Sequence, residues 1–402
     1  MGYAKAQMEK GFSSVGDTFV CADCFEDYAI QNFIESIAEN NECDYCGETS
    51  EEAIAAPIDN VIEFIVNGIE SEYENPGNSV GWCSAEGGWV GTTVCDSYEL
   101  VKELVEVSPN SNTLIGDIIE AVSDREWCHI DPYGNPMSDE WFLDWEAFCE
   151  GIKHNTRYVF YRLPTKKDET KFYKRAENPY DILEEIGKIV KELEIIETLP
   201  VGTEFVRVRP HAAEQVFTSV QELGPPQIEY AKFSNRMSPA GIPMFYGSFD
   251  EKTALAETSN ESKEFATSAI FRTLLSFKVL NLSEYQNLPS IFDEDRRFLR
   301  QHIIFLRNFI DDIAKPVVKD GTEHYEYVPT QVVTEYFRHI FKDDEGDRIQ
   351  GIIYPSSVLP GGKACVLFFQ QIDCTQDNVP ELKDKWLNMI TASIKTASIS
   401  VI

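Results

Sequence analysis

The sequence contains no long uninterrupted run of apolar residues. Its first twelve residues mix polar, charged and apolar side chains, so they match neither a secretory signal nor a membrane-spanning helix. We therefore expect a cytoplasmic protein with no membrane partner. In a reducing compartment, the 10 cysteines are interpreted as metal ligands or small buried apolar groups rather than as disulfides.

Basic residues are scarce. The 402-residue chain has 35 lysines and arginines against 68 aspartates and glutamates, which gives a formal net charge of -33. Such a field repels a phosphate backbone, so we do not expect nucleic acid as a partner. The charge is interpreted first as a solubility feature, with attraction of a basic partner protein as the alternative.

Glycine-rich phosphate-binding motifs are also missing. No GxxxxGK[ST] sequence occurs, and no GxGxxG follows a predicted strand. This argues against a P-loop nucleotide hydrolase and against a Rossmann-type dinucleotide site. The length of the chain and its 43% apolar content nevertheless predict two or three folded domains.

Two Cys-x-x-Cys pairs stand near the N-terminus, Cys21 with Cys24 and Cys43 with Cys46. Each pair can turn two thiolates toward one ion, and four thiolates suit a tetrahedral zinc. Apolar residues at helical spacing over 27–38 predict a helix between the pairs, which leaves little room for a catalytic open position. We predict a structural zinc in the segment 1–55. A redox role and four unrelated buried cysteines are the alternatives.

Residues 56–165 carry apolar residues at helical intervals and are predicted to be mostly helical. The glycine-rich stretch 81–89 predicts a loop or a short hairpin, and Ser138 predicts the start of another helix. Further cysteines of this region are irregularly spaced, so we interpret them as core residues rather than as a second metal site: Cys83, Cys95, Cys128 and Cys149. A linker with a bracing helix over 182–196 is predicted for 166–202, because 166–174 is locally basic and polar.

Residues 203–402 show short apolar segments among turns, with helical periodicity between some of them. Strands are predicted over 205–208, 243–246, 269–279, 349–354 and 364–369, and helices over 294–309 and 330–341. This region is therefore expected to be a mixed α/β domain whose sheet need not be parallel. The fold class of the chain is α+β.

Four segments of this last region occur in a characteristic order. They are Phe-Val-Arg-Val-Arg at 205–209, the stretch 235–248, Thr-Ala-Leu-Ala-Glu at 253–257, and Gly-Ile-Ile-Tyr-Pro-Ser-Ser at 351–357. In this order they resemble the RES family, which takes its name from an arginine, a glutamate and a serine. We match these to Arg207, Glu257 and Ser356, with Arg209 and Ser357 as alternative occupants. Met237 and Ser238 stand where the family usually has Trp and Asn.

The resemblance implies an ADP-ribosyltransferase-like fold and an enzyme that cleaves the nicotinamide bond of its substrate NAD, with water or phosphate as acceptor. Arg207 and Arg236 would bind phosphate oxygens through paired hydrogen bonds. Tyr246 would offer its ring to nicotinamide or adenine. Glu257 would stabilise the positive charge that develops on the ribose, and Ser356 would position the substrate.

Residues 56–165 resemble the HEPN-like region that precedes some RES domains. HEPN ribonucleases use an Arg-x4-6-His pair, whereas Arg125 and His129 are separated by only three residues, so ribonuclease activity is not expected. The family's association with toxin–antitoxin pairs implies a toxin or phage-defence role and an antitoxin or regulatory protein as partner, and leaves a homo-oligomer open. The alternative functions are ADP-ribosyl transfer to a macromolecule and a non-catalytic zinc-containing module, the latter favoured by Met237 and Ser238.

Overall fold

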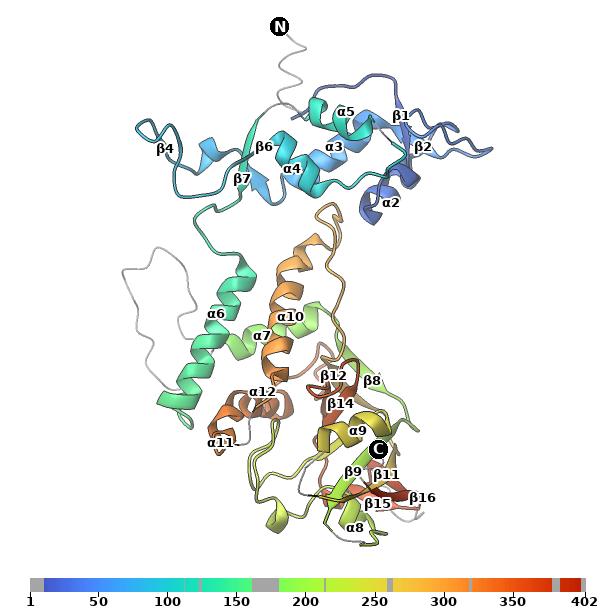
Figure 1. Cartoon of the computed structure of the whole chain (residues 1–402), viewed down its shortest axis with the longest axis vertical. Helices are drawn as coiled ribbons and strands as arrows, with labels where there is room; N and C mark the ends of the chain where they lie inside the picture. The colour runs from blue at the N-terminus through green and yellow to red at the C-terminus, as the bar shows by residue number, and fades with distance from the viewer. Residues whose placement is uncertain are drawn as a thin grey trace. The chain divides into compact units, whose positions relative to one another are not determined.

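The computed structural model describes residues 11–111, 113–122, 125–160, 181–212, 215–258, 263–317, 320–377 and 384–398. The chain forms two compact units, drawn in Figure 1. Unit 1 takes in the chain up to Pro136 together with Leu288–Gln301, and unit 2 comprises Met137–Asn287 and His302–Ile402. The units thus divide the chain at Pro136, whereas the sequence predicted boundaries after residues 55, 165 and 202. The predicted basic stretch 166–174 lies outside the described residues.

Unit 1 combines helices with very short strands. Its helices are α2 (Tyr28–Ile37), α3 (Ile58–Ile69), α4 (Ser97–Leu104) and α5 (Leu114–Ala121). Strands β1 (Phe19–Cys21) and β2 (Ala55–Pro57) pair with each other, and β3 (Tyr73–Glu74), β7 (Glu126–His129) and β6 (Cys95–Asp96) form a three-stranded sheet. The predicted glycine-rich hairpin is present as β4 (Trp82–Cys83) and β5 (Gly88–Trp89). The expectation of a mostly helical region therefore missed the small sheet.

The helix predicted between the Cys-x-x-Cys pairs is confirmed as α2. The carboxylate of Asp27 accepts hydrogen bonds from the backbone N–H groups of Ala29 and Ile30 and so caps the helix. Ile30 and Ile34 then face the core one turn apart and are fully buried.

One apolar core fills unit 1, and part of it comes from a distant stretch of chain. Ile291 and Phe292 lie in this core among the side chains of α2, α3 and α5. The Phe292 ring packs against Gly68 of α3 so closely that a Cβ atom there would lie 2.3 Å from it. Arg300 also forms an ion pair with Glu72, with 2.7 Å between Nε and the carboxylate oxygen. The segment 288–301 is thus a structural part of unit 1.

Unit 2 is built on a nine-stranded mixed sheet in the order β15-β16-β11-β9-β10-β14-β13-β12-β8. The strands are β8 (Ile196–Leu199), β9 (Glu204–His211), β10 (Phe245–Ser248), β11 (Phe265–Thr273), β12 (Phe277–Asn281), β13 (Gly351–Pro355), β14 (Lys363–Leu367), β15 (Cys374–Gln376) and β16 (Leu387–Ser398). Two neighbouring pairs are parallel, β12 with β13 and β15 with β16. The predicted mixed sheet is confirmed, although the single strand expected over 269–279 is two strands that lie apart in the sheet.

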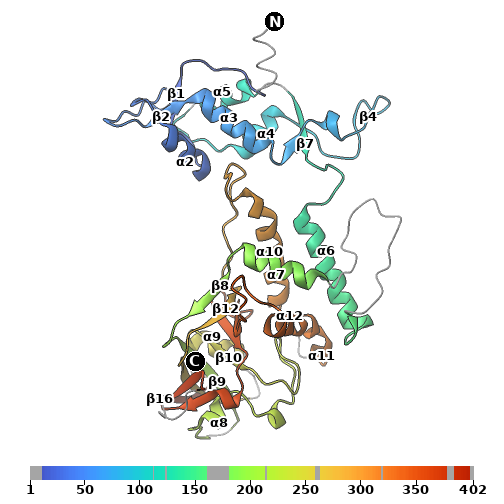
Figure 2. The ribbon, with the colours of Figure 1, turned by 180° about the vertical axis from the view of Figure 1, so that it is seen from behind.

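The helices of unit 2 lie together beside the sheet, apart from the two that flank β9 (Figure 2). The helices beside the sheet are α6 (Met137–Glu150), α7 (Ile182–Glu192), α10 (Arg300–Ala314), α11 (Glu323–Glu326) and α12 (Val328–His339). Helix α6 continues as a π-helical turn over Gly151–Asn155. The flanking helices are α8 (Val220–Leu223) and α9 (Glu251–Thr258). The bracing helix expected over 182–196 ends at Glu192, where β8 follows. Among the described residues no helix is long and apolar enough to span a bilayer.

Alternation along the strands gives the sheet two distinct faces. On one face, Phe205 packs with Phe245, Phe271 and Leu223 of α8 in a large apolar core. On the other face, Val208 packs with residues of α9 and β11. Because neighbouring residues in a strand point to opposite sides, every residue of β9 and β10 is assigned to the α8 face or the α9 face.

Candidate functional site

Glu257 and Ser356 meet on the α9 face, although 99 residues separate them in the chain. Glu257 lies in the last turn of α9, and Ser356 follows the end of β13. The Ser356 hydroxyl donates a hydrogen bond of 2.5 Å to Oε1 of Glu257 and accepts one from the backbone N–H of Leu359 at 3.0 Å. Ser356 therefore holds one carboxylate oxygen in place. Among the described residues, the other oxygen, Oε2, accepts no hydrogen bond.

Two tyrosines lie on this same face of the sheet, the partly buried Tyr246 and the buried Tyr354. Tyr246 on β10 and Tyr354 on β13 both point to the α9 side, because the register pairs Tyr354 with Ala364 and Ala364 with Ser248. Burial raises the pKa of both hydroxyls, and the Glu257 carboxylate contributes to the shift at Tyr354. Tyr354 was not predicted as a site residue, although it stands two positions before Ser356 in a predicted strand.

The Tyr246 hydroxyl is hydrogen-bonded to Ser238, with 2.9 Å between the two oxygens. Ser238 and its neighbour Met237 are almost completely buried. Thr334 of α12 donates a hydrogen bond to the Met237 sulfur at 3.3 Å. Met237 and Ser238 are therefore packed between α12 and Tyr246.

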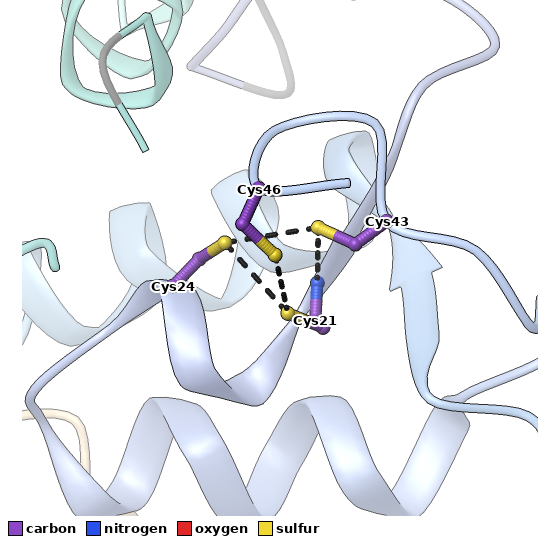
Figure 3. Close-up of side chains that lie close together, drawn as sticks. All are labelled: Cys21, Cys24, Cys43 and Cys46. Carbon is purple, nitrogen blue, oxygen red and sulfur yellow. Dashed lines mark hydrogen bonds between the residues drawn. The ribbon is translucent and has the colours of Figure 1, made fainter. Parts of the chain in front are cut away.

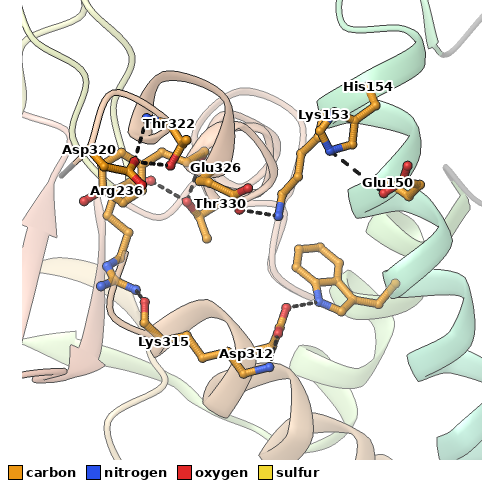
Figure 4. Close-up of polar contacts among 12 residues, drawn as sticks. Glu150, Lys153, His154, Arg236, Asp312, Lys315, Asp320, Thr322, Glu326 and Thr330 are labelled. Carbon is orange, nitrogen blue, oxygen red and sulfur yellow. Dashed lines mark hydrogen bonds and ion pairs between the residues drawn. The ribbon is translucent and has the colours of Figure 1, made fainter. Parts of the chain in front are cut away.

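Arg236 lies next to the Glu257–Ser356 pair. Its Nη1 donates to the carbonyl oxygens of Ile313 and Lys315, at 2.6 and 2.8 Å, and its Nη2 donates to the Ser357 hydroxyl at 3.3 Å. Figure 4 shows the guanidinium directed toward Lys315, with Thr330 beside the Arg236 backbone. No carboxylate pairs with Arg236 in the part of the chain that the structure describes. Its positive charge is thus held close to Ser357 without a fixed counter-ion.

Arg207 and Arg209 point to the opposite, α8 face. The register pairs Arg207 with Ala269, which belongs to the core on the α8 side. Arg207 donates to the carbonyl oxygens of Leu223 and Tyr246, at 2.9 and 2.5 Å, and Arg209 donates to a carbonyl of α8. Burial lowers the pKa of Arg207 to about 10, so the group stays protonated at neutral pH.

The seven predicted site residues therefore do not all lie on one face of the sheet. Glu257 is hydrogen-bonded to Ser356, Arg236 is hydrogen-bonded to the adjacent Ser357, and Tyr246 lies on the same face of the sheet as α9. Arg207 and Arg209 lie on the opposite, α8 face, because side chains two residues apart on β9 share one face and this face packs on α8.

A cleft of about 470 Å³ lies along the first turns of α9. Its lining includes Glu251, Leu255, Ala266 and Ser268 but not Glu257 or Ser356. Glu251 accepts a hydrogen bond of 2.6 Å from Ser268 there. The cleft lies on the same face of the sheet as the Glu257–Ser356 pair, but it does not include that pair.

The four N-terminal cysteines form a compact cluster, and Figure 3 shows their side chains directed toward one another. The sulfur of Cys21 lies 3.7 Å from that of Cys24 and 3.5 Å from that of Cys46, and the sulfurs of Cys24 and Cys43 are 3.7 Å apart. Four thiolates bound about 2.3 Å from a tetrahedral zinc would lie about 3.8 Å from one another. The cluster therefore has the size and donor set of a closed metal site.

The environment of Cys43 favours an anionic sulfur. The hydrogen bond from the Cys24 thiol lowers the pKa of Cys43, and backbone N–H groups contribute in the same direction. The Cys21 backbone N–H donates to this sulfur at 3.3 Å. Of the other cysteines of the N-terminal half, Cys128 is buried as expected of a core residue, whereas Cys83, Cys95 and Cys149 are only partly buried.

Arg125 and His129 do not form a facing pair. Arg125 is ion-paired with Glu70 at 2.9 Å and its guanidinium stacks over the Trp127 ring. His129 stacks on Tyr73, with 4.3 Å between the ring centroids. His129 ends β7, the central strand of the small sheet, and Arg125 immediately precedes this strand; each is engaged with a different partner. Nothing in this arrangement supports a ribonuclease site.

Comparison with known proteins identifies two domains in the chain. The model for HEPN/RES N-terminal domain 1 matches residues 36–167, and the model for the RES domain matches residues 205–388. Arg236, Tyr246, Glu257 and Ser356 all fall within the second match. No curated protein and no solved structure matches the chain.

Proposed function

The chain is a RES-domain protein with a HEPN/RES N-terminal domain, and on this premise we propose that it is an enzyme that cleaves the nicotinamide N-glycosidic bond of NAD. RES domains are associated with NAD-using enzymes and with toxin–antitoxin pairs. We propose a bacterial toxin or phage-defence role, with an antitoxin or regulatory protein that restrains the enzyme. The observation that carries the proposal is the 2.5 Å contact between Ser356 and Glu257.

Glu257 supplies the negative charge that this reaction requires. When the bond between ribose C1 and the nicotinamide nitrogen breaks, its electron pair leaves with nicotinamide and positive charge spreads over C1 and the ring oxygen. A fixed carboxylate beside that charge stabilises the transition state because it needs no reorganisation during the reaction. Ser356 holds Oε1, so Oε2 is the oxygen that faces the ribose or takes a proton from the incoming water.

Arg236 and Tyr246 position the substrate. The Arg236 guanidinium has no carboxylate partner in the described part of the chain, so it is available to the pyrophosphate. Tyr246 presents its ring on the Glu257 side of the sheet and is fixed by Ser238. Arg207 acts as a positioning residue, because it holds the Tyr246 carbonyl from behind the sheet. Ser357 orients Arg236.

The test is NAD turnover by the purified full-length protein, with nicotinamide release followed by chromatography. Glu257→Gln should lower kcat by roughly 10²- to 10⁴-fold, because the amide keeps the shape of the side chain but loses its charge. Glu251→Gln is the matched control on the same helix and should leave turnover unchanged. Equal turnover by the Glu257→Gln variant and the wild type, with both folded, would refute the site.

Product analysis identifies the acceptor. Hydrolysis adds water across the broken bond and yields free ADP-ribose, whereas phosphate as acceptor yields ADP-ribose that carries a phosphate on the ribose. Reactions with and without phosphate, analysed by mass spectrometry, separate these outcomes. Transfer to a macromolecule would instead appear as a mass increase on an added protein or nucleic acid, and it would replace hydrolysis as the function of the same site.

We also propose that the cysteine cluster holds a structural zinc, which would tie β1 and the turn after it to the loop between α2 and β2 when bound. The donor set of four sulfurs leaves no open position for a substrate. Metal analysis of the purified protein should find one zinc per chain, and Cys21→Ser combined with Cys43→Ser should abolish it. Cys83→Ser is the control, since Cys83 lies outside the cluster. Full zinc content in the double variant would contradict the assignment.

A further inference from the structure

The charge of the molecule is concentrated in the N-terminal unit. Between Gly11 and Val101 the sequence contains 19 aspartates and glutamates and no lysine, arginine or histidine. Such a surface repels nucleic acid and anionic membranes and attracts cationic segments of proteins. The charge is too strongly one-sided to be needed for solubility alone, since a net charge of magnitude about 2–8 suffices for a small domain.

An exposed aromatic cluster lies on this acidic unit, at the β4–β5 hairpin. The Trp82 side chain is 55% exposed, and its ring meets the edge of Trp89 with 5.1 Å between centroids. Tyr133 and Val90 beside it are 45% and 37% exposed. We call these four residues the hairpin patch. Tryptophan and tyrosine are the residues that most often contribute binding energy at protein interfaces, and they are rarely exposed together without a role.

The hairpin patch is held in shape by polar contacts. The Trp89 indole N–H donates to the Glu126 carboxylate at 2.7 Å. The Tyr133 hydroxyl donates to the Val90 carbonyl at 2.9 Å and accepts from the Gly81 N–H at 3.2 Å. A preformed patch loses little side-chain entropy when a partner binds.

Acidic groups surround the patch. Glu86 lies at the tip of the hairpin, Glu126 beneath Trp89, and Asp131 next to Tyr133 in sequence, and all three are exposed. A cation placed over the exposed Trp82 ring would gain from the ring quadrupole and from these carboxylates together. A second copy of this unit would instead bring like charges together.

From these observations we propose that the hairpin patch is a docking surface for an arginine- or lysine-rich segment of a partner protein. The cationic side chains would lie against Trp82 and the surrounding carboxylates, and apolar side chains of the same segment would cover Val90 and Tyr133. This surface is separate from the Glu257 site and does not depend on the proposed activity.

The experiment uses the full-length protein and a labelled peptide that alternates arginine and leucine, with fluorescence anisotropy as the readout. The same peptide with glutamate in place of arginine is the charge control. We expect binding of the arginine peptide only, weakened by added salt. Trp82→Ala, which leaves the net charge unchanged, should weaken binding by about tenfold or more.

Phe233→Ala is the matched control variant, because Phe233 is 82% exposed and lies in unit 2. It should bind the arginine peptide as the wild type does. Equal affinity of the Trp82→Ala and wild-type proteins, each with an unchanged circular dichroism spectrum, overturns the proposal. So does equal binding of the glutamate peptide. A dimer seen in analytical ultracentrifugation that Trp82→Ala dissociates would also overturn it, since the occupant would then be a second copy of the chain.

Discussion

Replacement of Gly68 by alanine tests whether the segment 288–301 belongs to the core of unit 1. Gly68 is near the end of α3, and an added Cβ would lie 2.3 Å from one ring atom of Phe292 and 2.9 Å from another. Real Cβ atoms do not approach carbon so closely, so either Phe292 or the helix must move. Phe292 is almost completely buried, which limits where its ring can go.

The size of the effect follows from two opposing terms. Alanine is favoured over glycine inside a helix by roughly 0.5–1 kcal/mol. Overpacking of a dense core costs about 1–3 kcal/mol. We therefore expect Gly68→Ala to lower the stability of unit 1 by about 1–2 kcal/mol. Gly116→Ala in α5 gains the helical preference of alanine without overpacking, because no atom beyond its chain neighbours and its own helix backbone lies within 4 Å of the added Cβ. This replacement should therefore stabilise the unit.

The measurement is hydrogen exchange followed by mass spectrometry on peptides of α3 and α5. This local readout is preferable to a single melting curve, because a chain with two compact units need not unfold in one step. Exchange should be faster in the Gly68→Ala protein and slower in the Gly116→Ala protein than in the wild type. Phe292→Leu in the Gly68→Ala background should recover part of the loss, since the smaller side chain leaves room for the new methyl group.

Equal stabilisation by both glycine replacements would refute this reasoning. It would mean that Phe292 does not occupy the space beside Gly68 and that the segment 288–301 is not part of that core. Destabilisation by Gly116→Ala would point to a different error, namely that α5 is not a regular helix at this position.

Three further predictions concern unit 2. Hydrogen bonds from Thr253 lower the pKa of Asp250 from its ordinary 3.8. The Asp250 carboxylate therefore stabilises α9 above the pKa of the unfolded state, and this stabilisation is lost as the pH falls through the pKa of the folded state. In thermal melts at low pH, the stability of Asp250→Asn should approach that of the wild type. Tyr246→Phe should cost about 1–3 kcal/mol in urea unfolding, because Ser238 is left buried without its partner, and removal of both hydroxyls should cost less than the sum. Arg207→Lys should lose about 1.5–3 kcal/mol in the same assay, since lysine cannot reach both carbonyls, and an unchanged midpoint would contradict this.

Elements with a local cause were predictable from the sequence. The helix between the cysteine pairs follows from an N-cap aspartate and isoleucines one turn apart, and its observed bounds, Tyr28–Ile37, fall within the predicted 27–38. The spacing of Cys21, Cys24, Cys43 and Cys46 predicted a cluster, and the sulfurs lie within 4.8 Å of one another. The small sheet of unit 1 was missed because its two- to four-residue strands depend on partners far away in the chain.

The sequence pointed to several residues of the candidate site but not to their arrangement. Alternation along β9 is visible in the sequence, yet which face packs on α8 and which on α9 is decided by contacts with distant segments. Arg207 was therefore expected beside Glu257, whereas the strand register places its side chain on the α8 face of the sheet. Tyr354 and Ser238 were overlooked as contributors because a tyrosine in a buried strand and a serine in a loop carry no distinctive local signal.

Because residues 288–301 complete unit 1, they also affect how this unit folds during synthesis. When residue 136 leaves the exit tunnel, the nascent N-terminal unit still lacks Ile291 and Phe292, so the hollow that they fill stays open to water or to a chaperone. At roughly 5–20 residues per second, on the order of ten to thirty seconds pass before Gln301 has been made. The core of unit 1 is therefore completed by a segment that is translated well after the rest of the unit.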